Sequence, residues 1–154
     1  MKTASYLFTA LLLLLSATMY GQTKGKTTTN QWVKVRDDQM ATIYYDKNIQ
    51  KNRRGNNVVW VKTIFHDPEW QNYMASQIGS RTPVHMTKTK AEYDEAYTAV
   101  QVRQVMAYSK ANKLLYNSGD GGEAEWGYVN ASDPVGIVGE YLNEIWRDNY
   151  SGWE

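Results

Sequence analysis

The chain has 154 residues, of which 42% are hydrophobic and 21% charged, as in an ordinary single globular domain. A net charge of +1 gives no basic footprint for nucleic acid, and a cysteine count of zero excludes a disulfide framework, thiolate metal sites, a cysteine nucleophile and a lipid anchor on cysteine. Its 12 Tyr and 6 Trp, against 2 Phe, suit half-buried sheet faces and binding surfaces.

Residues 1–21 have the pattern of a signal peptide. Lys2 gives a positive start, residues 6–15 form an apolar run, and small residues precede Gln22. The apolar run is shorter than the ~20 residues that a spanning helix needs. We therefore expect export to the periplasm, the cell surface or the medium, with no membrane span after cleavage. A polar, flexible leader is predicted over residues 22–30.

The first half of the mature chain reads as strands. Residues 31–36 alternate polar and apolar side chains, and residues 41–46 are β-branched and aromatic, which predicts a hairpin. Residues 46–57 carry Asn and Gly and form a basic connection. Apolar side chains on both faces of residues 58–65 predict a central strand.

The middle of the chain is harder to interpret. Asp67-Pro68 ends the central strand, and a short helical turn is predicted within residues 69–86. Residues 93–108 are predicted as one long strand with a β-bulge near Arg103-Gln104, and a helix is the alternative. Short strands are predicted at 113–116 and 126–128, on either side of a glycine-rich turn.

A C-terminal helix begins at Asp133-Pro134, with Asp as the N-cap and Pro at the first helical position. Apolar residues recur from Val135 to Ile145 at intervals of three and four, so this helix has one face for the sheet. It is expected to end near Asp148, with a tail over 149–154. The domain over 31–148 is therefore predicted as α+β, with about six antiparallel strands and a C-terminal α-helix packed on them.

Two groups of residues are candidates for binding. The basic connection offers charges to an acidic polysaccharide or an anionic protein surface, although a solubilising loop is the favoured interpretation. Trp32 and Tyr44 are candidates for a recognition surface, whereas Tyr45 and Trp60 are expected in the core. The basic candidates are Lys47, Lys51, Arg53 and Arg54.

No residue pattern points to catalysis or to a cofactor. His66, Asp67 and Glu69 suggest a metal or acid–base cluster, but a strand-ending turn is the simpler interpretation. Asp120, Glu123 and Glu125 lack the alternating carboxylates of a calcium loop. Neither nucleophile-elbow nor metalloprotease nor phosphate-loop motifs occur. We expect a protein that is not an enzyme and has no cofactor or metal.

The order of these elements resembles the surface-adhesin protein E family. The first half is similar in WVKV at 32–35, IYYD at 43–46 and VVWVK at 58–62, and the second in Arg103, Tyr108, the Trp126 strand and the closing helix. The resemblance covers about residues 31–147. It implies an antiparallel sheet with a packed helix, and adhesion to host extracellular matrix, often as dimers. The family's cysteine pair and lipid anchor have no counterpart here.

These observations favour an exported, non-catalytic binding module for a protein or acidic polysaccharide, with homodimers allowed. Two other classes stay open. One is a structural or assembly protein of the bacterial cell envelope that pairs through an exposed strand edge. The other is a periplasmic small-ligand carrier with a pocket between the sheet and the helix.

Overall fold

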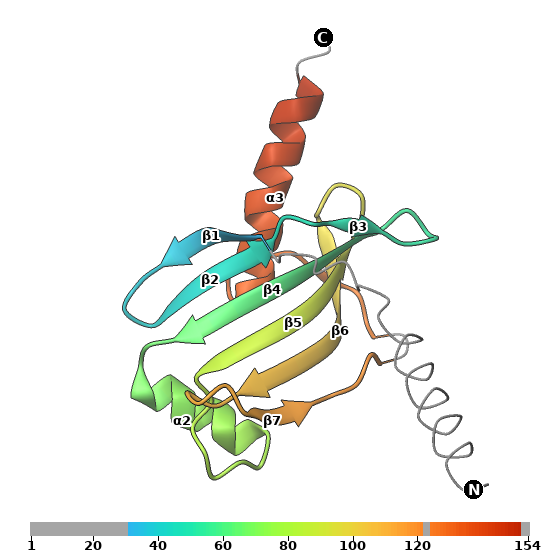
Figure 1. Ribbon diagram of the computed structural model, residues 1–154. Coiled ribbons are helices and arrows are strands. Elements are labelled where there is room, and N and C mark those ends of the chain that lie inside the picture. The colour runs from blue at the N-terminus through green and yellow to red at the C-terminus, as the bar shows by residue number, and fades with distance from the viewer. Residues whose placement is uncertain (1–30, 122–123, 152–154) are drawn as a thin grey trace, which may run out of the picture.

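The computed structural model describes residues 31–121 and 124–151, and its centre is one antiparallel β-sheet (Figure 1). Six strands lie side by side in the order β1-β2-β4-β5-β6-β7, while two very short strands, β3 and β8, pair with β4 and β6. The bounds are β1 Trp32–Asp37, β2 Ala41–Asp46, β3 Gln50–Lys51, β4 Asn57–Phe65, β5 Met86–Tyr93, β6 Ala99–Tyr108, β7 Leu114–Asn117 and β8 Gly127–Tyr128. The predicted hairpin and the central position of β4 are confirmed.

Two helices in the described residues begin at an aspartate cap followed by proline. α2 spans Pro68–Gln77, and the Asp67 side chain accepts a hydrogen bond from the Glu69 amide at 2.8 Å. α3 spans Pro134–Tyr150, and Asp133 accepts one from the Gly136 amide at 2.8 Å. These bonds satisfy amides that have no partner within the helix, which fixes where each helix starts. The predicted start of α3 is confirmed, and its end lies two residues beyond the predicted one.

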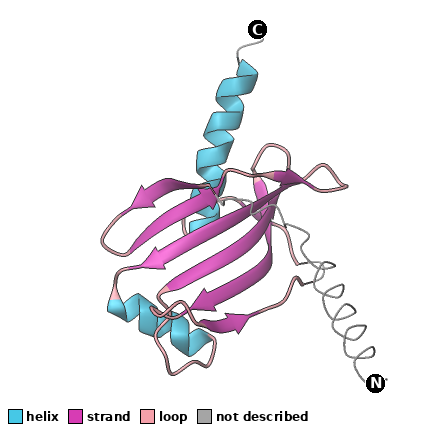
Figure 2. Cartoon of the chain, viewed as in Figure 1, coloured by secondary structure: helices cyan, strands magenta, loops and turns pink. Residues whose placement is uncertain are grey.

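Both helices cover the same face of the sheet. Along β4, Val59, Val61 and Phe65 point to this face and are buried, as the period of two requires. α3 packs over β1, β2, β4 and β5 through Val138 and Leu142, while α2 covers the far end of the sheet at Phe65. In Figure 2 the sheet passes in front of α3, so the face turned to the viewer is the one without helices. The predicted packing of the C-terminal helix on an antiparallel sheet is confirmed.

A buried tyrosine joins the sheet to α3. Tyr93, at the end of β5, is fully buried, and its hydroxyl donates a 2.7 Å hydrogen bond to the Val135 carbonyl in the first turn of α3. Burial raises the pKa of Tyr93, and the nearby Asp133 carboxylate raises it further. The phenol therefore stays protonated, as its role as donor requires.

The predicted strand over 93–108 is confirmed over Ala99–Tyr108, but its first residues are not part of it. β5 ends at Tyr93 and β6 begins at Ala99, because Asp94 folds the chain back: its Oδ1 accepts hydrogen bonds from the amides of Thr98 and Ala99 at 2.6 and 3.0 Å. Tyr97 in this turn has a positive φ of 59°. The helical alternative is wrong.

Other predictions differ in extent. The β-bulge is confirmed, since Ala91 pairs with Val102 while Lys90 pairs with Gln104, which leaves Arg103 as the extra residue of β6. The predicted helical turn is a full helix, α2. The predicted six strands become eight in the described residues, because β5 was missed and β3 was not predicted. The predicted signal peptide and flexible leader lie outside the described residues.

Candidate binding site

The helix-free face of the sheet gathers aromatic and lysine side chains. We call it the aromatic–lysine face. It is built from half-buried residues that alternate with the core along five strands: Trp32, Tyr44, Trp60, Lys62, Lys88, Met106 and Tyr108. Pairing brings them together, because Lys62 on β4 lies opposite Tyr44 on β2 and opposite Lys88 on β5, and Lys88 lies opposite Met106 on β6.

The centre of this face is a pair of like charges. Lys62 and Lys88 are direct cross-strand partners, and neither forms an ion pair with a carboxylate of the described residues. Like charges opposite each other destabilise a sheet. Burial lowers the pKa of Lys62, and the charge of Lys88 lowers it further. An anion bound at this pair would relieve the repulsion.

Aromatic rings hold the lysines in place. The Lys62 ammonium nitrogen lies 4.5 Å from the ring centre of Trp32 and 4.4 Å from that of Tyr44, and Lys88 lies 5.6 Å from that of Tyr108. Such cation–π contacts stabilise a charge by about 0.5–1 kcal/mol at exposed sites. They offset part of the repulsion and leave the ammonium groups in reach of a ligand. A hollow of about 160 Å³ lies beside them, lined by Trp32, Trp60, Lys88 and Met106.

Two further lysines that point to the same side of the sheet are neutralised. Lys34 lies 2.9 Å from Asp37, an exposed pair that raises the pKa of Lys34 and lowers that of Asp37. Lys90 lies 2.7 Å from Asp120, whose pKa is lowered by this contact. The positive potential of the face therefore concentrates at its centre.

The basic connection lies at one end of the same face. Asn52 folds it, since its side-chain oxygen accepts hydrogen bonds from the amides of Arg54 and Asn56 at 2.9 and 3.1 Å. The amide groups of Asn52 and Asn56 both donate to Glu92, at 2.7 and 2.6 Å. Glu92 alternates with Lys88 along β5 and so points to the aromatic–lysine face.

Glu92 is buried, and its charge is retained. Burial alone would raise the pKa of Glu92, but the hydrogen bonds from Asn56 and Asn52, and the charge of Arg103 at 3.8 Å, hold it below its ordinary value. The network fixes the basic connection to the sheet, and the predicted Lys47, Lys51, Arg53 and Arg54 are all exposed upon it.

The predicted binding residues therefore form two neighbouring groups. Trp32 and Tyr44 come together around Lys62. Lys47 begins the basic connection next to Trp32, since its amide donates to the Gln31 carbonyl at 3.0 Å, and Lys51, Arg53 and Arg54 follow farther along that connection. Tyr45 is buried in the core beside α3, as expected. Trp60 was predicted in the core, and this is wrong: it shares the outward parity of Lys62 on β4 and is half-buried on the open face.

The sequence prediction missed Lys62, Lys88, Met106 and Tyr108. A signal for Lys62 was present, since it follows Trp60 by two residues and so shares its face. No comparable signal existed for the residues of β5 and β6, because β5 returns beside β4 only after α2, and β6 joins β5 through a turn that was not predicted.

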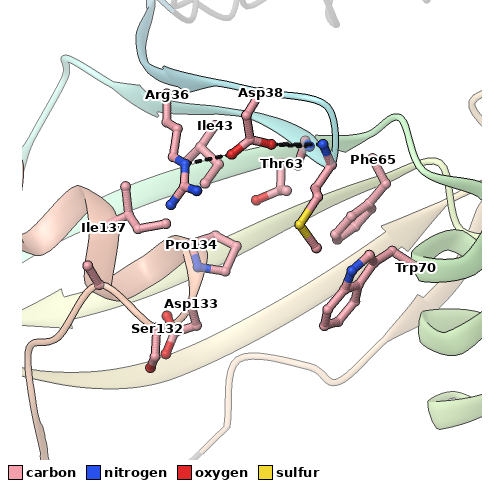
Figure 3. A pocket seen from close by; sticks show the side chains of 13 residues that line it. Arg36, Asp38, Ile43, Thr63, Phe65, Trp70, Ser132, Asp133, Pro134 and Ile137 are labelled. Carbon is pink, nitrogen blue, oxygen red and sulfur yellow. Dashed lines mark hydrogen bonds and ion pairs between the residues drawn. The ribbon is translucent and has the colours of Figure 1, made fainter.

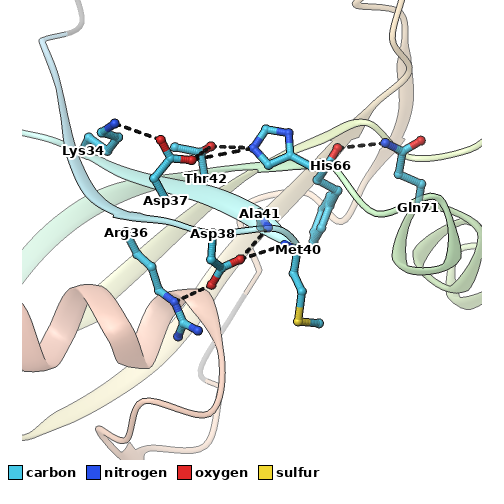
Figure 4. Close-up of polar contacts among 10 residues, drawn as sticks. Lys34, Arg36, Asp37, Asp38, Met40, Ala41, Thr42, His66 and Gln71 are labelled. Atoms are coloured by element: carbon cyan, nitrogen blue, oxygen red, sulfur yellow. Dashed lines mark hydrogen bonds and ion pairs between the residues drawn. The ribbon is translucent and has the colours of Figure 1, made fainter.

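His66 lies at the rim of the face in a polar cluster (Figure 4). The Thr42 hydroxyl donates to Asp37 at 2.8 Å, and His66 Nε2 lies 2.6 Å from the same hydroxyl oxygen. A hydroxyl has one proton, so His66 is the donor in its contact with Thr42 and does not act as a base toward it. The arrangement resembles a hydrolase triad only in its residue types.

The acidic candidates have structural contacts. Asp67 caps α2, and Asp120 pairs with Lys90, while Glu69 and Glu125 are exposed. Glu123 lies outside the described residues. Within residues 31–121 and 124–151, no three or more His, Cys, Asp or Glu side chains are grouped as a metal ion would require.

The fold defines an α+β protein with an antiparallel sheet closed on one face by helices. Comparisons with protein-family models, with curated proteins and with solved structures find no match. Among the described residues, no helix has the length and apolar character needed to cross a membrane.

Proposed function

We propose that this protein is an exported, non-catalytic binding module that holds an acidic polysaccharide on its aromatic–lysine face. One observation carries the proposal: Lys62 and Lys88 face each other across two strands without an anionic partner in the described residues, and aromatic rings surround them. Export rests on the signal-peptide pattern of residues 1–21. The resemblance to the surface-adhesin protein E family supports the same class of function.

The chemistry of the face suits a chain of charged sugars. The C–H faces of sugar rings pack against flat aromatic surfaces such as Trp32 and Trp60, and carboxylate or sulfate groups pair with ammonium groups. The basic connection extends this positive surface past the end of the sheet. A polymer that crosses the face therefore meets the lysine pair first and the exposed Lys51, Arg53 and Arg54 next.

Binding of heparin, a sulfated polysaccharide, tests the role of the lysine pair. Lys62→Gln combined with Lys88→Gln should weaken binding at least about tenfold, a change of about 1.4 kcal/mol. The matched control is Lys110→Gln combined with Lys113→Gln. It removes the same charge from the exposed turn between β6 and β7 and should change the affinity less than about twofold. Equal losses in the two variants would show a nonspecific charge effect and refute the site.

Two further arms identify the ligand class and the role of the loop. Uncharged dextran should not bind, and a poly-glutamate peptide that binds more tightly than heparin would favour an acidic protein partner instead. Lys51/Arg53/Arg54→Ala should weaken heparin binding and reduce its salt dependence, with an unchanged circular dichroism spectrum. An unchanged affinity would remove the basic connection from the site.

Localisation is tested in cells. We expect the protein in the envelope or the medium, and exposure to added protease on intact cells would place it at the surface. A protein found only in the cytoplasm would refute the proposal of an exported module.

A further inference from the structure

A groove crosses the opposite face of the sheet, between α2 and the start of α3. It consists of two adjoining cavities of about 720 and 180 Å³. Both are lined by Thr63, Phe65, Trp70, Ser132, Asp133 and Pro134, so they form one continuous space. Its size lies in the range of sites for small molecules.

The groove exists because the two helices leave a gap between two separate core clusters. α3 packs at one end of the sheet and α2 at the other. Between the two helices, Thr63 of β4 and Thr87 and Thr89 of β5 point into the groove. Farther along both strands, the positions that point to the same face hold buried apolar residues instead. The floor is therefore polar at the point that no helix covers.

The threonine floor has unused hydrogen-bonding groups. Thr63 and Thr87 are cross-strand partners, only 1% and 6% exposed, and neither hydroxyl has a hydrogen-bond partner in the described residues. In Figure 3 the Thr63 hydroxyl points into the space in front of Pro134. A buried polar group normally has a partner, so these hydroxyls are suited to a ligand oxygen.

The walls of the groove are apolar and partly open. Trp70 is 40% exposed on α2 and Val102 is 41% exposed on β6. Trp70 is held in place by an edge-to-face contact with Tyr73, with ring centres 5.4 Å apart. Trp70 therefore offers a flat apolar wall on α2, and Val102 extends the floor of the sheet with an apolar side chain.

Charge at the mouth selects against anions. Arg36 is paired with Asp38 at 2.7 Å, so the two charges cancel, and Asp133 adds a negative charge (Figure 3). A carboxylate or sulfate ligand would meet net repulsion here, in contrast to the aromatic–lysine face.

We infer that this groove binds a neutral, mainly apolar small molecule that carries a carbonyl or hydroxyl group. The apolar body lies against Trp70 and Val102, and the polar group accepts hydrogen bonds from Thr63 and Thr87. The inference goes beyond the proposed function, because the groove and the aromatic–lysine face lie on opposite sides of the sheet.

Benzophenone tests the inference, because it is a neutral aromatic ketone that forms covalent adducts where it binds when irradiated. Mass spectrometry should place the adducts on peptides that contain Trp70, Met74 or Val102. Adducts concentrated at Met86 or Met106, or spread evenly over the chain, would overturn the groove as the site. The double variant Lys62→Gln/Lys88→Gln should label as the wild type does, so the two proposals fail separately.

Two variants measure the contribution of the groove. Val102→Arg places a charged side chain in it and should reduce labelling at least about tenfold. Leu114→Arg is the matched control, because Leu114 is 48% exposed on β7 and outside the groove lining, and it should change labelling less than about twofold. Equal effects would overturn the inference. Thr63→Val keeps the side-chain shape and should weaken labelling by removing one donor, and an unchanged value would refute the hydroxyl floor.

Two further outcomes would identify a different occupant. Benzophenone-4-carboxylate should label more weakly than benzophenone, and stronger labelling would contradict the neutral ligand class. Light scattering should show the same mass for the wild type and Val102→Arg. A wild-type dimer that Val102→Arg converts to a monomer would show that a second copy of the chain occupies the groove, and this would overturn the small-molecule site.

Discussion

Gly136→Ala should destabilise the protein, although alanine is the better helix former. In the interior of a helix this change alone would stabilise by about 1 kcal/mol. However, a Cβ built at Gly136 lies 1.5 Å from the carbonyl oxygen of Asn130 and 2.7 Å from its carbonyl carbon. Both are backbone atoms, so no side-chain rotation removes the clash. The start of α3 must move about 2 Å away from the preceding loop to restore ordinary contact.

That movement disturbs two hydrogen bonds in the first turn of α3. One is the cap from Asp133 to the Gly136 amide, and the other joins Tyr93 to the Val135 carbonyl. Loss of a cap costs about 1 kcal/mol and overpacking about 1–3 kcal/mol. After the gain in helix propensity, we expect a net loss of about 1–3 kcal/mol in the free energy of unfolding.

Urea denaturation followed by circular dichroism measures this loss. The control is Gly127→Ala, where the nearest atom to a new Cβ is the Val100 carbonyl oxygen at 4.0 Å. We expect the control to change stability by less than about 0.5 kcal/mol. An unfolding midpoint of Gly136→Ala at or above that of the wild type would refute the close packing of α3 against the loop at Asn130.

Two further predictions concern buried polar groups. Since the folded pKa of Glu92 is depressed, the stability that this carboxylate contributes is present above its unfolded value of about 4.5 and is lost as the pH falls through the folded value. The urea midpoint of the wild type should therefore fall between neutral pH and a pH below 4.5, and it should fall by more than the midpoint of Glu92→Gln does. An equal fall in both proteins would contradict the network. Tyr93→Phe should cost about 1–1.5 kcal/mol because it leaves a helix carbonyl without its 2.7 Å partner, and an unchanged urea midpoint would contradict that hydrogen bond.

Local sequence signals predicted the elements that local chemistry determines. The hairpin of β1 and β2 and the start of α3 follow from alternation and from an Asp-Pro cap. β5 escaped prediction because its residues alternate between threonine and lysine over 87–90, which looks like a polar loop. Its lysines belong to the aromatic–lysine face and its threonines to the groove, so few apolar residues mark it as a strand.

The candidate sites required pairing that the sequence does not display. Trp32, Tyr44 and Trp60 were visible as aromatic residues, but the position of Lys88 beside Lys62 depends on the connection through α2, which brings β5 back beside β4. The groove depends equally on two helices that meet the sheet at separate places. Long-range pairing of this kind leaves little trace in composition or periodicity.

The parity of one strand separates the two proposed activities. Lys62 and Thr63 are neighbours on β4, yet their side chains point to opposite faces, one toward the aromatic–lysine face and one toward the groove. A slip of one residue in the pairing of β4 would exchange them and also turn Val61 out of the core, so the buried face fixes both sites at once. Lys62→Gln should therefore weaken only the binding of heparin, and Thr63→Val should weaken only the labelling by benzophenone. If either substitution changed both binding activities in a folded protein, the two faces would not be independent sites.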